Sequence, residues 1–88
     1  MEFNIDQLKK KIVYRSNYRG TKEMDQLLGS FTKKYIDIFT NEELKELEKL
    51  LDFDDDSLYS YYKGLNTDAN FENNRVNLLF KNFMYNAK

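Results

Sequence analysis

The sequence predicts an all-α fold, a compact single-domain bundle of about five short helices. The chain of 88 residues contains no proline and only three glycines, so few residues interrupt a helix. Its apolar residues recur at intervals of three and four, which is the spacing of one helix face. A chain this short has room for one hydrophobic core, so residues 1–88 are expected to form one domain.

The first two helices are predicted on either side of Gly20. The apolar stripe of the first helix comprises Ile5, Leu8, Ile12 and Val13. This helix should end near Gly20, because glycine readily adopts the left-handed conformation found at many helix ends. Thr21 is a suitable cap for the second helix. The stripe of that helix comprises Met24, Leu27, Leu28, Phe31, Tyr35 and Ile38. Gly29, in its interior, predicts a close packing contact, since glycine there costs about 1 kcal/mol relative to alanine.

Three further helices are predicted in the second half of the chain. Thr40 and Glu43 form a capping-box pattern, and the stripe that follows comprises Leu44, Leu47, Leu50 and Leu51. Residues 54–57 (Asp-Asp-Asp-Ser) should cap a fourth helix whose stripe comprises Leu58, Tyr61, Tyr62 and Leu65. A polar loop is expected at 66–70. The stripe of the last helix comprises Val76, Leu79, Phe80 and Phe83.

Three tyrosines in the fourth helix point in different directions. Tyr59, Tyr61 and Tyr62 fall on different faces of a helix, so at least one ring should be exposed and available to a partner.

The composition excludes several classes of function. Histidine and cysteine are both absent, which removes the commonest general base and the commonest metal ligands, so no metal site is predicted. The 15 acidic and 14 basic residues leave no basic excess for nucleic acid. No segment is long and apolar enough to predict a membrane span. The first six residues include acids and no apolar run, so neither a secretory signal nor a transit peptide is expected.

Charged residues cluster around Gly20. Arg15 and Arg19 lie at the end of the first predicted helix, and Glu23 and Asp25 lie in the first turn of the second. Cations at a helix C-terminus and anions at an N-terminus each gain about 0.3–1 kcal/mol from the helix dipole. From the residues alone, this structural role is the commoner interpretation.

The same residues resemble a known motif. Residues 19–23, Arg-Gly-Thr-Lys-Glu, are similar to the RGxxE motif of the succinate dehydrogenase flavinylation factors, also called FAD assembly factors. The flanking Arg15-Ser16 and residues 24–29 (Met-Asp-Gln-Leu-Leu-Gly) resemble bacterial members, and the resemblance covers about residues 8–84. The chain departs from the bacterial pattern at Asn17-Tyr18, which replaces Trp-His, and at Tyr61, which replaces Trp. The proline common in the family's acidic turn is also missing.

The resemblance implies a small helical chaperone that binds the flavoprotein subunit of succinate dehydrogenase and promotes covalent attachment of FAD there. It implies that Arg19, Gly20 and Glu23 form the centre of the contact surface, with Asp25 and Arg15 in support. Arg19 and Glu23 are accordingly expected to be exposed. FAD would be the cofactor of the partner and would not be held stably by this chain.

The resemblance also sets expectations for partners and location. The fumarate reductase flavoprotein is a possible second partner, and the free chain is expected to be a monomer. It is expected to be a bacterial cytoplasmic protein that is not itself an enzyme.

Three other functions stay open from the sequence. The chain could be a generic helical protein–protein adaptor unrelated to flavoproteins. A basic face formed by Lys9, Lys10, Lys11, Arg15 and Arg19 could bind nucleic acid. An enzyme would need Glu23 or Asp25 as an acid–base group acting on the flavin.

Overall fold

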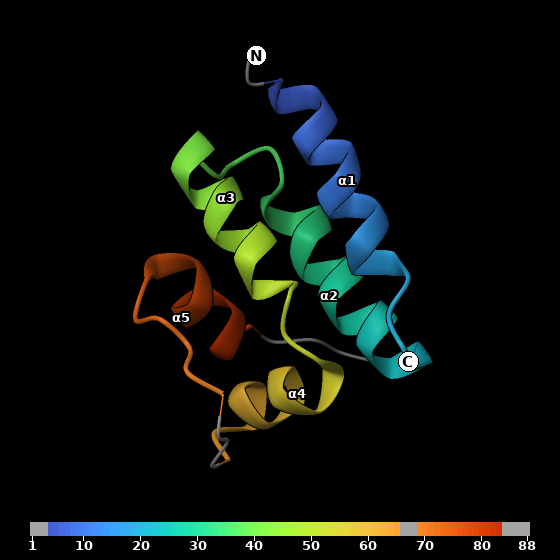
Figure 1. Ribbon diagram of the computed structural model, residues 1–88, viewed down its shortest axis with the longest axis vertical. Helices are drawn as coiled ribbons and strands as arrows, with labels where there is room; N and C mark the ends of the chain where they lie inside the picture. The colour runs from blue at the N-terminus through green and yellow to red at the C-terminus, as the bar shows by residue number, and fades with distance from the viewer. Residues whose placement is uncertain (1–3, 66–68, 84–88) are drawn as a thin grey trace.

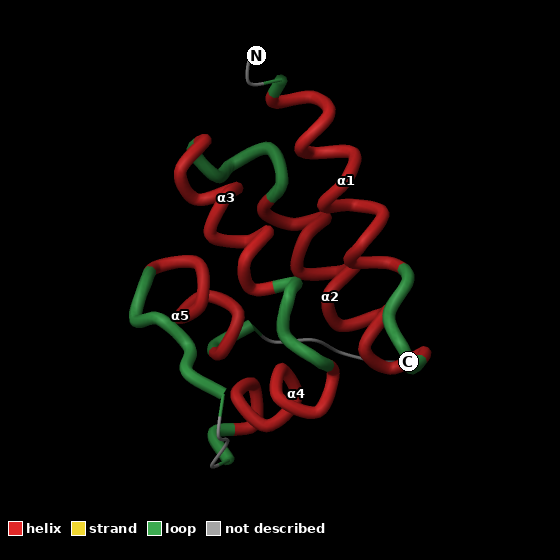
Figure 2. The backbone as a smooth tube through the Cα atoms, in the orientation of Figure 1, coloured by secondary structure: helices red, strands yellow, loops and turns green. Residues whose placement is uncertain are grey.

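The computed structural model describes residues 4–65 and 69–83, and it confirms the all-α prediction. Within these residues there are five helices and no strand (Figure 2). The helices are α1 (Ile5–Asn17), α2 (Lys22–Tyr35), α3 (Asn41–Leu50), α4 (Asp55–Lys63) and α5 (Arg75–Lys81). Part of the loop predicted at 66–70 lies outside the described residues. None of the described helices has the length and apolar character needed to span a bilayer.

The helices pack around a shared interior. Figure 1 shows α1 and α2 side by side, with α3 next to them, α5 beside α3 and α4 across one end. The most extensive contact joins α1 to α2, and further contacts join α1 to α3, α3 to α5 and α4 to α5. The loop between α1 and α2 and the loop between α3 and α4 therefore lie at the same end of the molecule.

Side chains at the helix starts satisfy backbone groups that would otherwise lack a partner. Asn4, Thr21, Thr40 and Asn74 each accept a hydrogen bond from an amide in the first turn of the following helix. Glu43 completes the predicted capping box by accepting the Thr40 N–H at 3.0 Å. At the start of α4, Asp54 makes no such side-chain cap.

Gly20 does not adopt the left-handed conformation that the sequence predicted. Among the described residues only Gly64, which ends α4, has a positive φ, at 74°. Helix α1 instead ends at Asn17, and Tyr18 follows with φ −128° and ψ 67°. The backbone conformation at position 20 therefore does not itself require glycine.

The predicted apolar stripes are largely buried, with errors at their ends. The buried core comprises Ile12, Met24, Leu27, Leu28, Phe31, Phe39, Leu44, Leu47, Leu50, Leu51, Leu58, Val76 and Phe80. Val13, Ile38 and Leu65 were predicted to face the core but are exposed. Ile38 and Leu65 lie beyond the ends of α2 and α4, so the helical periodicity no longer applies to them. Phe31 lies centrally and contacts the rings of Phe80 and Phe83, each with centroids 5.4 Å away.

Helices α1 and α2 approach each other closely. Buried Ser16 donates to the Ile12 carbonyl at 2.7 Å, so the Thr32 hydroxyl donates to Ser16 across the interface at 2.6 Å. Gly29 lies against Asn17, and a Cβ at Gly29 would be 2.5 Å from the Asn17 Oδ1. This confirms the close packing contact predicted for Gly29.

The prediction of an exposed tyrosine in α4 is wrong, because all three rings are half-buried. Tyr61 stacks on Phe71 at 4.2 Å, and burial raises the pKa of its phenol. The Tyr62 hydroxyl donates to the Phe83 carbonyl at 2.6 Å. The Lys63 ammonium covers the Tyr59 ring at 5.5 Å.

Phe80 and Leu78 offer a matched test of the core within α5. Phe80 is fully buried, whereas Leu78 is 45% exposed. We expect Phe80→Ala to lower the free energy of unfolding by about 3–5 kcal/mol, because it empties the volume beside Phe31. We expect Leu78→Ala to change it by about 0.5 kcal/mol or less. Urea denaturation followed by circular dichroism measures both, and equal losses would contradict the assigned core.

Glu43 gives the fold a dependence on pH. The Glu43 pKa is lowered, chiefly because its carboxylate accepts the Thr40 N–H. Desolvation raises this pKa in part, and Arg75, 2.5 Å away, lowers it further. A lowered pKa stabilises the fold above about pH 4.3, the ordinary pKa of glutamate, and the stabilisation is lost as pH falls through the folded-state pKa. We expect wild type to be more stable than Glu43→Gln at neutral pH, since glutamine keeps the capping geometry without the charge. The difference should shrink on acidification in urea unfolding, and a constant difference down to about pH 3 would refute the assignment.

Candidate functional site

The Arg19 guanidinium joins the two loops at one end of the bundle. Its Nε donates to the Asp55 Oδ1 at 2.8 Å, and its two terminal nitrogens donate to the carbonyls of Leu51 at 2.8 Å and Phe53 at 2.7 Å. The Arg19 side chain is only 11% exposed, so the expectation of an exposed arginine is wrong. A planar guanidinium can satisfy three diverging acceptors at once, and the last carbonyls of α3 favour a cation there.

Two carboxylates bind the backbone N–H groups of Arg19 and Gly20. The Asp25 carboxylate accepts the Arg19 N–H from the first turn of α2. The Asp55 Oδ2 accepts the Gly20 N–H at 2.8 Å, while its other oxygen binds Arg19. The loop between α1 and α2 is therefore held by α2 from one side and by α4 from the other.

The charge of Arg19 also affects the carboxyl group of Asp54, the neighbour of Asp55. Its carboxyl pKa is lowered, first by a hydrogen bond from the Ser57 side chain and to a smaller degree by the charge of Arg19. The lowered pKa favours the charged form of the Asp54 carboxyl, which complements the nearby Arg19 cation.

Glu23 and Arg15, the two remaining predicted site residues, have different surroundings. Glu23 is exposed and makes no hydrogen bond or ion pair with any other residue in the described ranges. Arg15 pairs with Asp52 at 2.5 Å, with the arginine 28% and the aspartate 68% exposed. Glu23 is thus available to a partner, whereas Arg15 already has one near the surface.

A shallow groove begins at Glu23 and runs between the start of α2 and the start of α4. It is lined by Thr21, Glu23, Met24, Asp55, Asp56, Tyr59 and Ser60. The structure therefore brings Gly20, Glu23 and Asp55 to one surface, and it places Arg19 beneath that surface as support.

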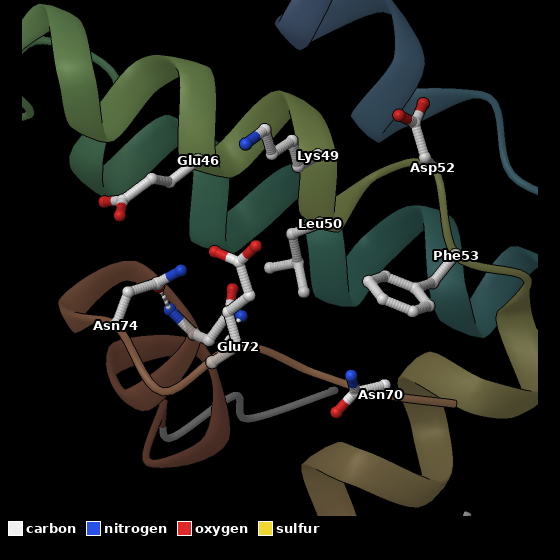
Figure 3. Close-up of a pocket in the computed structure, with 9 residues that line it drawn as sticks. Glu46, Lys49, Leu50, Asp52, Phe53, Asn70, Glu72 and Asn74 are labelled. Atoms are coloured by element: carbon white, nitrogen blue, oxygen red, sulfur yellow. Dashed lines mark hydrogen bonds between the residues drawn. The ribbon is translucent and has the colours of Figure 1, made fainter. Parts of the chain in front are cut away.

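A second pocket lies away from this groove. Figure 3 shows Glu46 and Lys49 of α3 facing Glu72 and Asn74, with Leu50 and Phe53 also lining the space. The buried Asn77 amide oxygen nearby has no hydrogen-bond partner in the described part of the chain. This pocket contains none of the residues of the RGxxE motif, and its lining carries both signs of charge.

The basic face that could have bound nucleic acid is largely neutralised. Lys9 pairs with Asp37 at 3.2 Å and Lys11 pairs with Glu48 at 2.9 Å. Arg15 and Arg19 pair with Asp52 and Asp55. Four of the five basic residues proposed for that face therefore have a carboxylate close by, which weakens their attraction for phosphates.

Sequence reasoning missed Asp55 as a site residue. The run at 54–57 was interpreted as a helix cap, and Asp55 is separated from Arg19 by 36 positions. Neither composition nor helical spacing relates residues so far apart. The sequence does show an acidic run and an arginine in the motif, but it does not show which carboxylate of the run pairs with that arginine.

Comparison with known proteins places these observations in a family. The model of a family described as "Flavinator of succinate dehydrogenase" matches residues 10–84. "Succinate dehydrogenase assembly factor 2, mitochondrial" from Debaryomyces hansenii is 43% identical over 75% of this chain and 46% of its own length. The protein of the same name from Lodderomyces elongisporus is 45% identical over 74% of this chain and 39% of its own length. "FAD assembly factor SdhE" from Acetobacter pasteurianus is 35% identical over 72% of this chain and 58% of its own length. No solved structure matches the chain significantly.

These comparisons contradict the expectation of a bacterial cytoplasmic protein. Several of the similar relatives are named as mitochondrial proteins of yeasts, which does not agree with a bacterial cytoplasmic assignment. The expectation relied on the resemblance to bacterial members of the family and on the acidic first residues of the chain. The chain spans about half or less of the length of the first of these relatives.

Arg19 and Arg15 provide a matched test of the site. We expect Arg19→Ala to lower the free energy of unfolding by about 2–4 kcal/mol, because it leaves Asp55 and two carbonyls without their donor. Arg19→Lys should recover little, since an ammonium cannot replace the planar fork. Arg15→Ala should cost about 1 kcal/mol or less, as for other surface pairs. Urea denaturation measures all three, and an Arg19→Ala variant as stable as Arg15→Ala would show that the loops do not depend on the guanidinium.

Proposed function

Because the chain belongs to the family of succinate dehydrogenase flavinators, we propose that it binds the flavoprotein subunit of succinate dehydrogenase and promotes covalent attachment of FAD to it. The chain is an assembly factor by family. The specific partner subunit and the flavin step are the content of the proposal. The fumarate reductase flavoprotein is a further candidate partner, and the free chain is proposed to be a monomer.

The exposed and unpaired Glu23, beside the firmly held Gly20, is the observation that supports this surface most strongly. Arg19, Asp25 and Asp55 fix the loop before any partner arrives. A surface that is already ordered loses less conformational entropy on binding. Glu23 then offers a carboxylate to a donor on the flavoprotein in a charge-assisted hydrogen bond.

The proposed role is to stabilise one conformation of the partner. The chain contains no histidine or cysteine, so its own side chains offer few groups for bond-forming chemistry. FAD and the flavoprotein supply that chemistry, and the factor binds preferentially to the state in which flavin and acceptor side chain are aligned. In this proposal FAD remains the cofactor of the partner.

The test is co-expression with the flavoprotein subunit in cells that lack their own assembly factor. Covalent flavin is scored by fluorescence of the flavoprotein band in a denaturing gel. We expect the band to require this chain and to fall about tenfold with Glu23→Ala, the equivalent of about 1.4 kcal/mol for one lost charge-assisted hydrogen bond.

Glu42 provides the matched control. It is an exposed glutamate at the second position of α3, as Glu23 is of α2, so Glu42→Ala should leave covalent flavin unchanged. Glu23→Gln separates two roles, because a variant that still binds the flavoprotein but yields no covalent flavin would indicate acid–base catalysis. Equal covalent flavin with and without the chain, with both proteins soluble, would refute the assembly role.

A further inference from the structure

Gly20 is required by contact with Asp55. Its φ is not in the left-handed region, so the backbone conformation itself is open to other residues. A Cβ at position 20 would lie 2.8 Å from the Asp55 Oδ2, which is closer than carbon and oxygen approach without a bond. A side chain at position 20 therefore has to displace the Asp55 carboxylate.

Displacing that carboxylate breaks more than one contact. One Asp55 oxygen accepts the Gly20 N–H and the other accepts the Arg19 Nε, both at 2.8 Å. The Asp55 side chain is only 19% exposed, so water replaces these donors poorly. A change at Gly20 therefore reaches the Arg19 guanidinium through Asp55.

We propose that Asp55 is a positioning residue of the RGxxE surface, and that Gly20 is glycine in order to admit its carboxylate. The functional unit then consists of Arg19 and Gly20 on one loop and Asp55 at the start of α4. Arg19 holds the two loops together, and Glu23 is presented to the partner. This inference rests on the proposed function for its effect on flavoprotein binding, whereas the contact between Asp55 and Arg19 belongs to the free chain.

A double-mutant cycle between Gly20 and Asp55 tests the proposal. The four chains are wild type, Gly20→Ala, Asp55→Ala and the double variant, and their affinity for the flavoprotein subunit is measured by calorimetry. We expect each single variant to bind about tenfold more weakly, and we expect the double variant to bind no more weakly than Asp55→Ala alone. Losses that multiply to about a hundredfold would overturn the proposal, because Gly20 would then act independently of Asp55.

A second measurement follows Arg19 in the free chain. Exchange of the Arg19 Nε–H with solvent, read by NMR, should be slow in wild type and fast in both single variants. Slow exchange in Gly20→Ala would overturn the proposal, whatever the partner does. If wild type itself fails to bind the flavoprotein, the proposed function fails, and this measurement still decides the role of Asp55.

Two further variants control for folding. Asp55→Asn keeps the side-chain volume and one acceptor, so it should fold and bind with intermediate affinity. Asp6→Ala removes an exposed first-turn aspartate from α1 and should bind as wild type does. If neither Asp55 variant folds, as judged by circular dichroism, Asp55 serves the stability of the domain and its positioning role is refuted.

Discussion

The end of the molecule that carries the motif depends on satisfying one nearly buried guanidinium. A charged group removed from water needs hydrogen-bonding partners for each of its donors, and Arg19 finds them in Asp55 and in two carbonyls that follow α3. The two carbonyls belong to the loop between α3 and α4, and Asp55 is the first residue of α4, so all three lie far along the chain from Arg19. The Arg19 guanidinium thereby helps to hold the start of α4 against the loop between α1 and α2, next to the exposed surface around Glu23.

The elements of the fold were readable from the sequence because their signals are local. The Thr40–Glu43 capping box and the leucine stripe of α3 both lie within a few positions, and each predicted its helix correctly. Two of the errors, at Ile38 and Leu65, occur where a local pattern runs past a helix end, whereas exposed Val13 lies within α1. Gly20 was misinterpreted for a related reason. A glycine after a helix suggests a left-handed cap, but a contact from a residue 35 positions away determines its role.

The candidate site was predictable only in part. Arg19, Gly20 and Glu23 were identified through a resemblance to a family, and membership of that family is supported over residues 10–84. The sequence alone could not show which of these residues is buried and which is exposed, because burial is a property of the assembled fold. Arg19 is internal and Glu23 is external, although both are charged and only four positions apart. A motif can therefore combine an exposed residue with residues that hold the backbone in place.

The long separation between Arg19 and Asp55 also bears on the order of folding. Contacts between α1 and α2 join neighbouring elements, whereas the Arg19–Asp55 bond closes a loop of 36 positions at a larger cost in chain entropy, so we expect it to form after the intervening helices have packed. A nascent chain with only its first two helices paired lacks the carboxylate that arranges the surface. We therefore expect the surface around Glu23 to reach its final arrangement only after α4 has packed, as one of the last steps of folding.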